Sequence, residues 1–195
     1  FNIDPEKLAE QVAKIKSESK LTPKAIIAVD LFGLPAEYDQ IEKIAEENGL
    51  FLVEDGAQGF GGVYNGKKAC SFGDISATSF FPAKPLGCYG DGGAVFTDDD
   101  ILAEKLRSIR VHGKGTDKYD NIRLGLNGRL DTLQAAVLLS KIEIFDNELS
   151  RKEKIAEYYN ANLDNSLVKP EIPANSKSAW AQYSLCSSKR DQIMG

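Results

Sequence analysis

The chain has 195 residues, of which 42% are hydrophobic and 27% are charged, a balance typical of a soluble globular protein. Its formal net charge of -5 argues against a nucleic-acid-binding surface, which is usually basic. No apolar run is long enough to span a membrane, and the first residues do not have the pattern of a signal peptide. The three scattered cysteines favour neither a zinc site nor a disulfide framework, so we expect a reducing cytoplasm.

The first part of the chain predicts two helices that alternate with two buried strands. Asp4 and Pro5 are a typical N-cap and first helical residue, and apolar residues then recur at helical spacing. The short apolar runs 25–29 and 50–53 are typical of buried strands. Between these runs, an amphipathic pattern predicts a helix that Gly49 ends.

The middle of the chain predicts a glycine-rich loop, two further strands and a helix. The loop covers 56–73 and contains Asn65-Gly66, a pair that favours a tight hairpin. Strands are predicted at 76–80 and 94–97. The acidic run 98–100 then favours a helix start, because the helix dipole stabilises negative charge there.

The last part predicts a polar loop and two long helices. The loop covers 112–121, and Asp131 is placed to cap a helix that runs to about Leu149. Apolar residues lie on several sides of this helix, so we expect it to pack against both the sheet and a partner. A further helix over 150–163 leads towards a small domain. Strands that alternate with helices indicate an α/β fold with a largely parallel sheet.

Asp55 and Ser79 follow two of the predicted strands, and Lys84 comes shortly afterwards. Ligands of such sheets bind beyond the carboxyl ends of the strands, so we expect these residues to share one site. Pro82 and Pro85 stiffen the backbone around the lysine. Pyridoxal phosphate (PLP) needs a lysine for its aldehyde and a carboxylate for its ring nitrogen. The alternatives are a solvated surface lysine and a helix-capping or surface carboxylate.

The chain resembles the DegT/DnrJ/EryC1/StrS family of sugar aminotransferases, which have the type I aminotransferase fold. The motifs that carry the resemblance extend nearly from end to end of the chain. They are Leu31-Phe32-Gly33, Glu54-Asp55-Gly56-Ala57-Gln58, Ser79-Phe80-Phe81-Pro82-Ala83-Lys84-Pro85-Leu86-Gly87, Gly90-Asp91-Gly92-Gly93 and Gly125-Leu126-Asn127-Gly128-Arg129-Leu130-Asp131.

The resemblance implies a PLP site and a role for each matching residue. Lys84 would bind the cofactor, and Asp55 would hold the ring nitrogen protonated. Gln58 would lie over the ring, and Ser79 would bind the phosphate unless its hydroxyl bonds to its own backbone. Asn127 would reach the phosphate bound by a neighbouring subunit, so the resemblance implies a homodimer with shared active sites.

Two further residues are candidates for substrate binding. Arg129 would clamp an acidic group of the substrate, or alternatively form a salt bridge with Asp131 or another acid. His112 follows Arg110 in a pattern that recurs in the family, and it is a candidate substrate contact. Because the chain has only 1 histidine and no cysteine pair near it, no metal site is predicted.

The function implied by the resemblance is PLP-dependent amination of a nucleotide-linked keto-sugar with glutamate as donor. The motifs look closest to the branch that aminates UDP-linked 3-keto-hexuronates for surface polysaccharides. A 4-keto-sugar aminotransferase and a non-catalytic regulatory protein remain alternatives. Family members are roughly twice as long, so we expect a fragment: 1–149 would be part of the large PLP-binding domain, and 150–195 a connecting helix and the start of a small domain.

Overall fold

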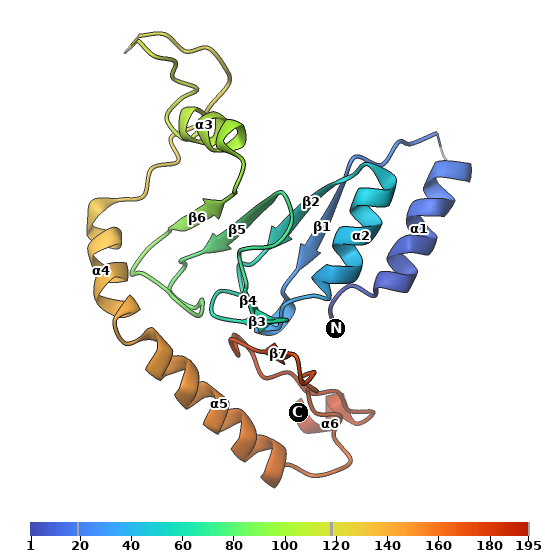
Figure 1. Ribbon diagram of the computed structural model, residues 1–195. Coiled ribbons are helices and arrows are strands. Elements are labelled where there is room, and N and C mark those ends of the chain that lie inside the picture. Colours follow the sequence, from blue (N-terminus) through green and yellow to red (C-terminus); the bar gives the residue numbers. More distant parts are fainter. Residues whose placement is uncertain (19, 118, 195) are drawn as a thin grey trace.

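The computed structural model describes residues 1–18, 20–117 and 119–194. Its centre is a four-stranded sheet in the order β1-β2-β5-β6 (Figure 1). The strands are β1 (Ala25–Val29), β2 (Phe51–Asp55), β5 (Ile75–Ser79) and β6 (Gly93–Phe96). The first three run parallel, as the sequence predicts, whereas β6 is an antiparallel edge strand. This arrangement places the carboxyl ends of β1, β2 and β5 at one edge of the sheet.

One face of the sheet is covered by the first two helices, α1 (Pro5–Glu18) and α2 (Tyr38–Asn48) (Figure 1). The start of α1 and the end of α2 lie at the residues that the sequence predicts. Asp4 Oδ1 accepts from the amides of the first turn of α1, and Gly49 ends α2 with a positive φ of 62°. Apolar side chains from these helices and from β1 and β2 form one buried core.

The opposite face of the sheet is open. The strands alternate between the two faces, so Ile27, Phe51 and Val95 point away from the α1–α2 core. These side chains are 62%, 62% and 50% exposed. Parallel sheets are normally covered on both faces. The uncovered face of this sheet is therefore a large exposed apolar surface of the chain.

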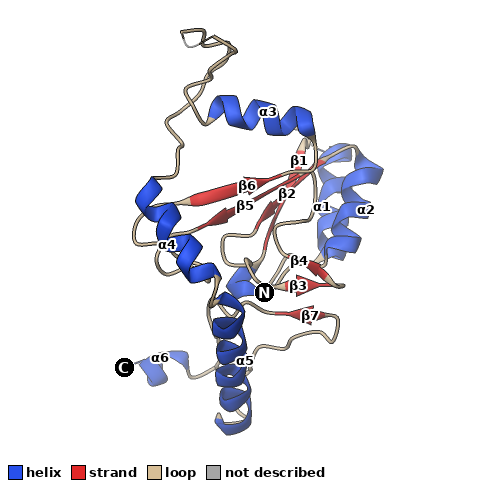
Figure 2. Cartoon of the chain, turned by 60° about the vertical axis from the view of Figure 1, so that its left-hand side comes forward, coloured by secondary structure: helices blue, strands red, loops and turns tan. Residues whose placement is uncertain are grey.

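A second, smaller sheet joins distant parts of the chain. It contains β3 (Val63–Tyr64), β4 (Lys67–Lys68) and β7 (Ser176–Lys177) in the order β4-β3-β7. Asn65 and Gly66 connect β3 to β4 with positive φ angles of 48° and 79°, which confirms the predicted tight hairpin. Through β7, the C-terminal part of the chain returns to pair with β3, which lies far from it in the sequence (Figure 2).

The remaining helices are α3 (Asp100–Ile109), α4 (Thr132–Ile142), α5 (Phe145–Asn162) and α6 (Arg190–Met194). The predicted single helix from Asp131 to Leu149 is wrong. A tight turn, in which the Ile144 amide donates to Lys141 O (3.2 Å), ends α4, and α5 then runs on through Ser150. The turn contains neither glycine nor proline, so the residues that usually mark such a break are missing. In residues 1–18, 20–117 and 119–194, no helix is long and apolar enough to cross a membrane.

Candidate active site

Asp55 and Ser79 lie on the same face of neighbouring strands. In the parallel pairing of β2 with β5, Asp55 lies opposite Ala77. Ser79 lies two residues beyond Ala77, towards the carboxyl end of β5. Because side chains alternate along a strand, Asp55, Ala77 and Ser79 share the open face of the sheet. The Asp55 carboxylate also accepts a hydrogen bond from the Ala57 amide (3.1 Å), which fixes the start of the following turn.

Gln58 lies in the turn that follows Asp55, and the neighbouring strand β5 holds this turn. The Gly56 amide donates to Ala77 O (2.8 Å), and the Thr78 hydroxyl donates to Gly56 O (2.9 Å). From the loop after β1, the Phe32 amide donates to Gln58 Oε1 (2.7 Å). The backbone of the adjacent loop therefore orients the side-chain amide of Gln58. Because its oxygen is held, the N–H groups of this amide point in a defined direction.

Ser79 ends β5 and combines the two roles considered from the sequence. Its Oγ accepts a hydrogen bond from the Phe81 amide (3.2 Å), so it does bond to the local backbone. A serine hydroxyl can accept and donate at the same time, which leaves the O–H of Ser79 able to donate to an anion. The local hydrogen bond therefore orients the hydroxyl without preventing phosphate binding.

Lys84 lies on a compact loop and is half-buried. Its amide donates to Phe81 O (2.9 Å), and the Cys88 amide closes the loop by donating to Phe80 O (2.8 Å). From α4, Lys141 Nζ donates to Gly87 O (2.6 Å) and attaches the loop to that helix. The thiol of Cys88 is buried in this loop and donates to Phe80 O (3.0 Å). The backbone that carries Lys84 is therefore held from both sides.

His112, Asn127 and Arg129 lie together in a different part of the chain. Val111 and Asn127 form an antiparallel bridge, and Arg129 Nε donates to Asn127 Oδ1 (2.9 Å). Among the described side chains, Arg129 forms no ion pair with Asp131. All three residues are exposed, and in the described part of the chain no hydrogen bond or ion pair joins them to Asp55, Gln58, Ser79 or Lys84. The segment between α3 (Asp100–Ile109) and α4 (Thr132–Ile142) that carries them extends away from the body of the sheet before it returns to α4 (Figure 1).

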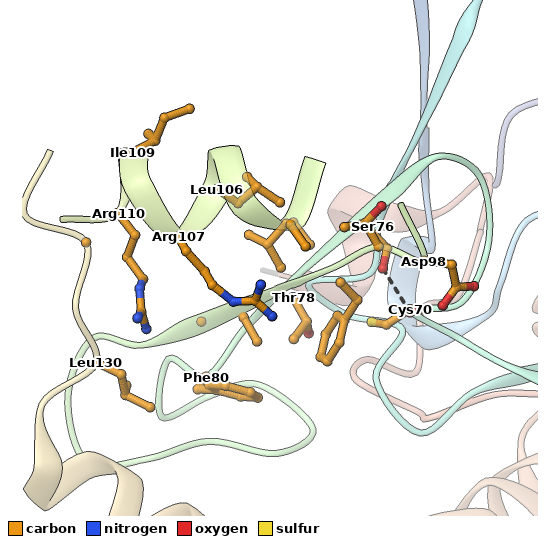
Figure 3. A pocket seen from close by; sticks show the side chains of 18 of the residues that line it. Cys70, Ser76, Thr78, Phe80, Asp98, Leu106, Arg107, Ile109, Arg110 and Leu130 are labelled. Carbon is orange, nitrogen blue, oxygen red and sulfur yellow. Dashed lines mark hydrogen bonds between the residues drawn. The ribbon is translucent and has the colours of Figure 1, made fainter. Parts of the chain in front are cut away.

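A cavity of about 1050 Å³ lies between α3 and the sheet, on the face opposite Asp55. Ser76, Thr78 and Phe80 line it from one side, and the guanidinium group of Arg107 is directed into it from α3 (Figure 3). The seven predicted site residues are absent from its lining. Its lining is mostly apolar, so we assign the chemistry to the strand ends and not to this cavity.

No functional role was predicted for Asp30 and Glu54, two buried acids that lie directly against the turn that carries Gln58. Both side chains are 0% exposed. Burial, together with the negative charge of Glu54, raises the pKa of Asp30 to about 8. Burial also raises the pKa of Glu54, an effect that amide hydrogen bonds from Cys70 and Phe72 oppose. Their positions in the sequence could have indicated this site. Asp30 directly follows an apolar strand, and the Glu54–Asp55 pair ends the next strand.

An α/β sheet with a lysine loop and an acid at neighbouring strand ends is the architecture of a PLP-dependent aminotransferase domain. The sequence model of the DegT/DnrJ/EryC1/StrS aminotransferase family matches residues 1–195, and the chain belongs to this family. The relatives described next agree with the predicted fold class, and the chain spans about half of their length.

A relative from Pseudomonas aeruginosa, the UDP-2-acetamido-2-deoxy-3-oxo-D-glucuronate aminotransferase, is 45% identical over 99% of this chain and 52% of its own length. The crystal structure of a DegT DnrJ EryC1 StrS aminotransferase from Brucella abortus has a TM-score of 0.96 and 52% identity, over 99% of this chain and 52% of the other. The Bacillus subtilis protein ntda, solved with bound cofactor PMP, has a TM-score of 0.83 and 27% identity, over 100% of this chain and 43% of the other.

The aminotransferases of this family depend on PLP, and the residues at the strand ends fit that cofactor. They supply an amine on a held loop, a carboxylate, an oriented side-chain amide and a hydroxyl with a free proton. These are the groups that an aldehyde, a pyridine nitrogen, a ring and a phosphate need. Lys84, Asp55, Gln58 and Ser79 respectively would hold the cofactor.

Proposed function

We propose that the chain is part of a PLP-dependent aminotransferase that transfers an amino group from glutamate to a nucleotide-linked keto-sugar. The observation that carries the proposal is the convergence of Asp55, Ser79 and the Lys84 loop at one edge of the sheet. The family of the chain and the name of its P. aeruginosa relative support the same chemistry.

Bound PLP would supply an aldehyde carbon that captures amines and a ring that accepts electrons. Lys84 would hold the cofactor through its amine, and its Nζ would accept and return the proton of the substrate carbon. The Asp55 carboxylate would hold the ring nitrogen in its protonated form, because a negative charge favours the cationic form. Gln58 would contact the ring, and the Ser79 hydroxyl would donate to the phosphate. Donor and acceptor would use the same residues in turn, which predicts ping-pong kinetics.

For the substrate, we propose a UDP-linked 2-acetamido-2-deoxy-3-keto-hexuronate used in surface polysaccharide biosynthesis in the cytoplasm. The motifs of the lysine loop and the P. aeruginosa relative, 45% identical, support this choice. A 4-keto-sugar nucleotide is the alternative substrate. A panel of UDP- and dTDP-linked keto-sugars, each assayed with glutamate and the full-length enzyme, distinguishes them by kcat/KM.

Borohydride reduction of the full-length enzyme with PLP, followed by peptide mapping, tests the role of Lys84. We expect the pyridoxyl group on Lys84, because its loop lies beside Asp55 and Ser79. Lys84→Ala removes the label and the visible absorbance of the bound cofactor. A label on Lys67, Lys68 or Lys114 contradicts the assignment. A protein that stays colourless in excess PLP favours a non-catalytic regulatory role.

We also propose a homodimer in which Asn127 and His112 of one subunit complete the site of the other. Two features support it: among the described residues no hydrogen bond joins Asn127 or His112 to the strand ends of their own chain, and α4 leaves apolar side chains uncovered. Leu133 and Leu139 of α4 are 80% and 69% exposed, and only Leu138 of this helix is buried. Both observations are what an interface through α4 requires.

Subunit mixing tests the shared site. Lys84→Ala and Asn127→Ala subunits are each expected to be weakly active, because every site of either homodimer lacks one group. A mixed dimer contains one site with neither substitution, so mixing is expected to restore up to about half of the wild-type activity per hybrid. A mixture that gains nothing over its parents, while native mass spectrometry shows hybrids, contradicts the proposal.

We propose that residues 1–149 and 150–195 belong to the large and small domains of a longer enzyme. The open face of the sheet, with Ile27 and Phe51 each 62% exposed, supports the proposal that the chain belongs to a longer enzyme, because a complete parallel α/β sheet is covered on both faces. We expect residues 1–195 alone to bind PLP more weakly than the full-length protein and to aggregate. Equal affinity and turnover of the two proteins would overturn the proposal.

A further inference from the structure

Asp30 and Glu54 form a buried acid pair at the carboxyl ends of β1 and β2. Their strands are neighbours, with Ala28 opposite Glu54 and Val29 opposite Asp55. The Asp30 amide continues this pairing by donating to Asp55 O (3.0 Å). Both acids are fully buried, on the face of the sheet that α1 and α2 cover. A pair of carboxyl groups in such a place needs a hydrogen bond for every oxygen atom.

The hydrogen bonds account for three of the four carboxyl oxygens. Glu54 Oε1 and Oε2 accept from the amides of Cys70 (2.5 Å) and Phe72 (2.9 Å). Asp30 Oδ1 accepts from the Tyr38 hydroxyl (2.7 Å) and the Ala36 amide (3.2 Å). In the described part of the chain, Asp30 Oδ2 is buried and receives no hydrogen bond. An oxygen without a donor that faces another carboxylate is the place where a proton belongs.

The pair also supports the turn that carries Gln58. A methyl group at Gly59 would lie 2.6 Å from Asp30 Cβ and 2.8 Å from Asp30 Cγ, so the backbone of the turn rests directly on the Asp30 side chain. Asp30 begins the loop whose Phe32 amide binds Gln58 Oε1, and Phe32 adopts a positive φ of 61° that is unfavourable for its side chain. The Asp30 carboxyl closes this loop through Ala36 and Tyr38.

We propose that Asp30 and Glu54 share one proton, held on Asp30 Oδ2 and donated to Glu54, and that this pair positions Gln58 against the cofactor ring. The second half of this inference rests on the proposed function, whereas the first half does not. The raised pKa of Asp30, about 8, agrees with a proton held at neutral pH. Among the described residues, the titratable groups that act on the pair are Tyr38, Glu42 and Cys70, and none of them is a cation.

Two conservative variants of the full-length protein separate the donor from the acceptor. Asp30→Asn places an N–H group where the proposed O–H lies, while its oxygen still accepts from Tyr38 and Ala36. Glu54→Gln turns an N–H group towards the amide of Cys70 or Phe72, where no acceptor remains. We expect Glu54→Gln to lower Tm by about 5–10 °C and Asp30→Asn to lower it by less than half as much at pH 7. Equal losses, or a larger loss in Asp30→Asn, overturn the proposal.

Infrared spectroscopy of the wild-type protein at pH 7 keeps the test independent of folding in the variants. We expect the carbonyl band of a protonated carboxylic acid, which Asp30→Asn removes. The control Asp98→Asn, at an exposed acid, leaves the band in place. A wild-type spectrum without this band overturns the shared proton.

The positioning of Gln58 is tested by the visible absorption of bound PLP and by kcat. Asp30→Ala removes the support of the loop. We expect a shifted absorption maximum and a decrease in kcat of up to about tenfold, with little change in KM for glutamate. Asp30→Asn is expected to recover most of both signals. An unshifted spectrum in Asp30→Ala overturns the positioning role. A wild-type protein that shows the infrared band but binds no PLP refutes the proposed function and leaves the shared proton standing.

Discussion

Gly59→Ala is expected to destabilise the protein strongly, although glycine-to-alanine changes are often favourable. The new methyl group would lie 2.6 Å from Asp30 Cβ, a separation that requires one of the two segments to move. Asp30 cannot move freely, because Tyr38 and Ala36 hold its Oδ1 atom. Overpacking of a buried site costs about 1–3 kcal/mol. If the Asp30 carboxyl loses one of its donors, about 1–3 kcal/mol is added. We therefore expect a total loss of about 2–6 kcal/mol.

Urea unfolding, followed by circular dichroism, measures this loss as the change in the free energy of unfolding. Gly49→Ala is the matched control, because it adds the same methyl group in open space. Gly49 has a φ of 62° and no atom within 4 Å of the new Cβ position, so only backbone strain of about 1 kcal/mol is expected. If Gly59→Ala costs no more than Gly49→Ala, the turn does not rest on Asp30 as described.

Three further predictions concern groups outside the lysine loop. An aromatic disulfide reagent is expected to modify exposed Cys186 quickly and buried Cys70 and Cys88 only after unfolding. Burial also raises the pKa of the Cys70 thiol to about 12, which keeps this thiol unreactive in the folded state. Fast labelling of a second thiol contradicts this prediction. Asp99→Ala removes the acceptor of two amides at the start of α3 and should cost about 1 kcal/mol in urea unfolding. Because the folded state holds the Asp30 proton up to about pH 8 and the unfolded state releases it near pH 4, this contribution to stability is present in acid and lost as pH rises. The slope is at most about 1.4 kcal/mol per pH unit, and a profile that Asp30→Asn does not flatten refutes the assignment.

Local signals in the sequence predicted the elements that local physics determines. The cap at Asp4, the helix end at Gly49 and the hairpin at Asn65-Gly66 all depend on a few adjacent residues, and the structure confirms each of them. The same reasoning placed Asp55 and Ser79 at strand ends, because a strand end is visible as the end of an apolar run.

Features that depend on long-range packing were missed. The antiparallel direction of β6 depends on how the lysine loop turns the chain, and no strand pattern encodes it. The break between α4 and α5 occurs at Glu143 and Ile144, which are both tolerated in helices. The pairing of Asp30 with Glu54 joins residues from different strands, so neither residue indicates it alone.

The two groups of site residues differ in what holds them in place. Asp55, Gln58, Ser79 and Lys84 are fixed by hydrogen bonds within one sheet and its loops, so their arrangement belongs to the folded chain itself. Asn127 is exposed, and its described contacts are the backbone bridge to Val111 and the hydrogen bond from Arg129 Nε. In the proposed dimer, the contribution of Asn127 therefore depends on association between subunits, whereas the arrangement around the lysine depends on the fold of one chain. The proposed Asp30–Glu54 pair, which supports the turn that carries Gln58, would keep the first group arranged even when the second is absent.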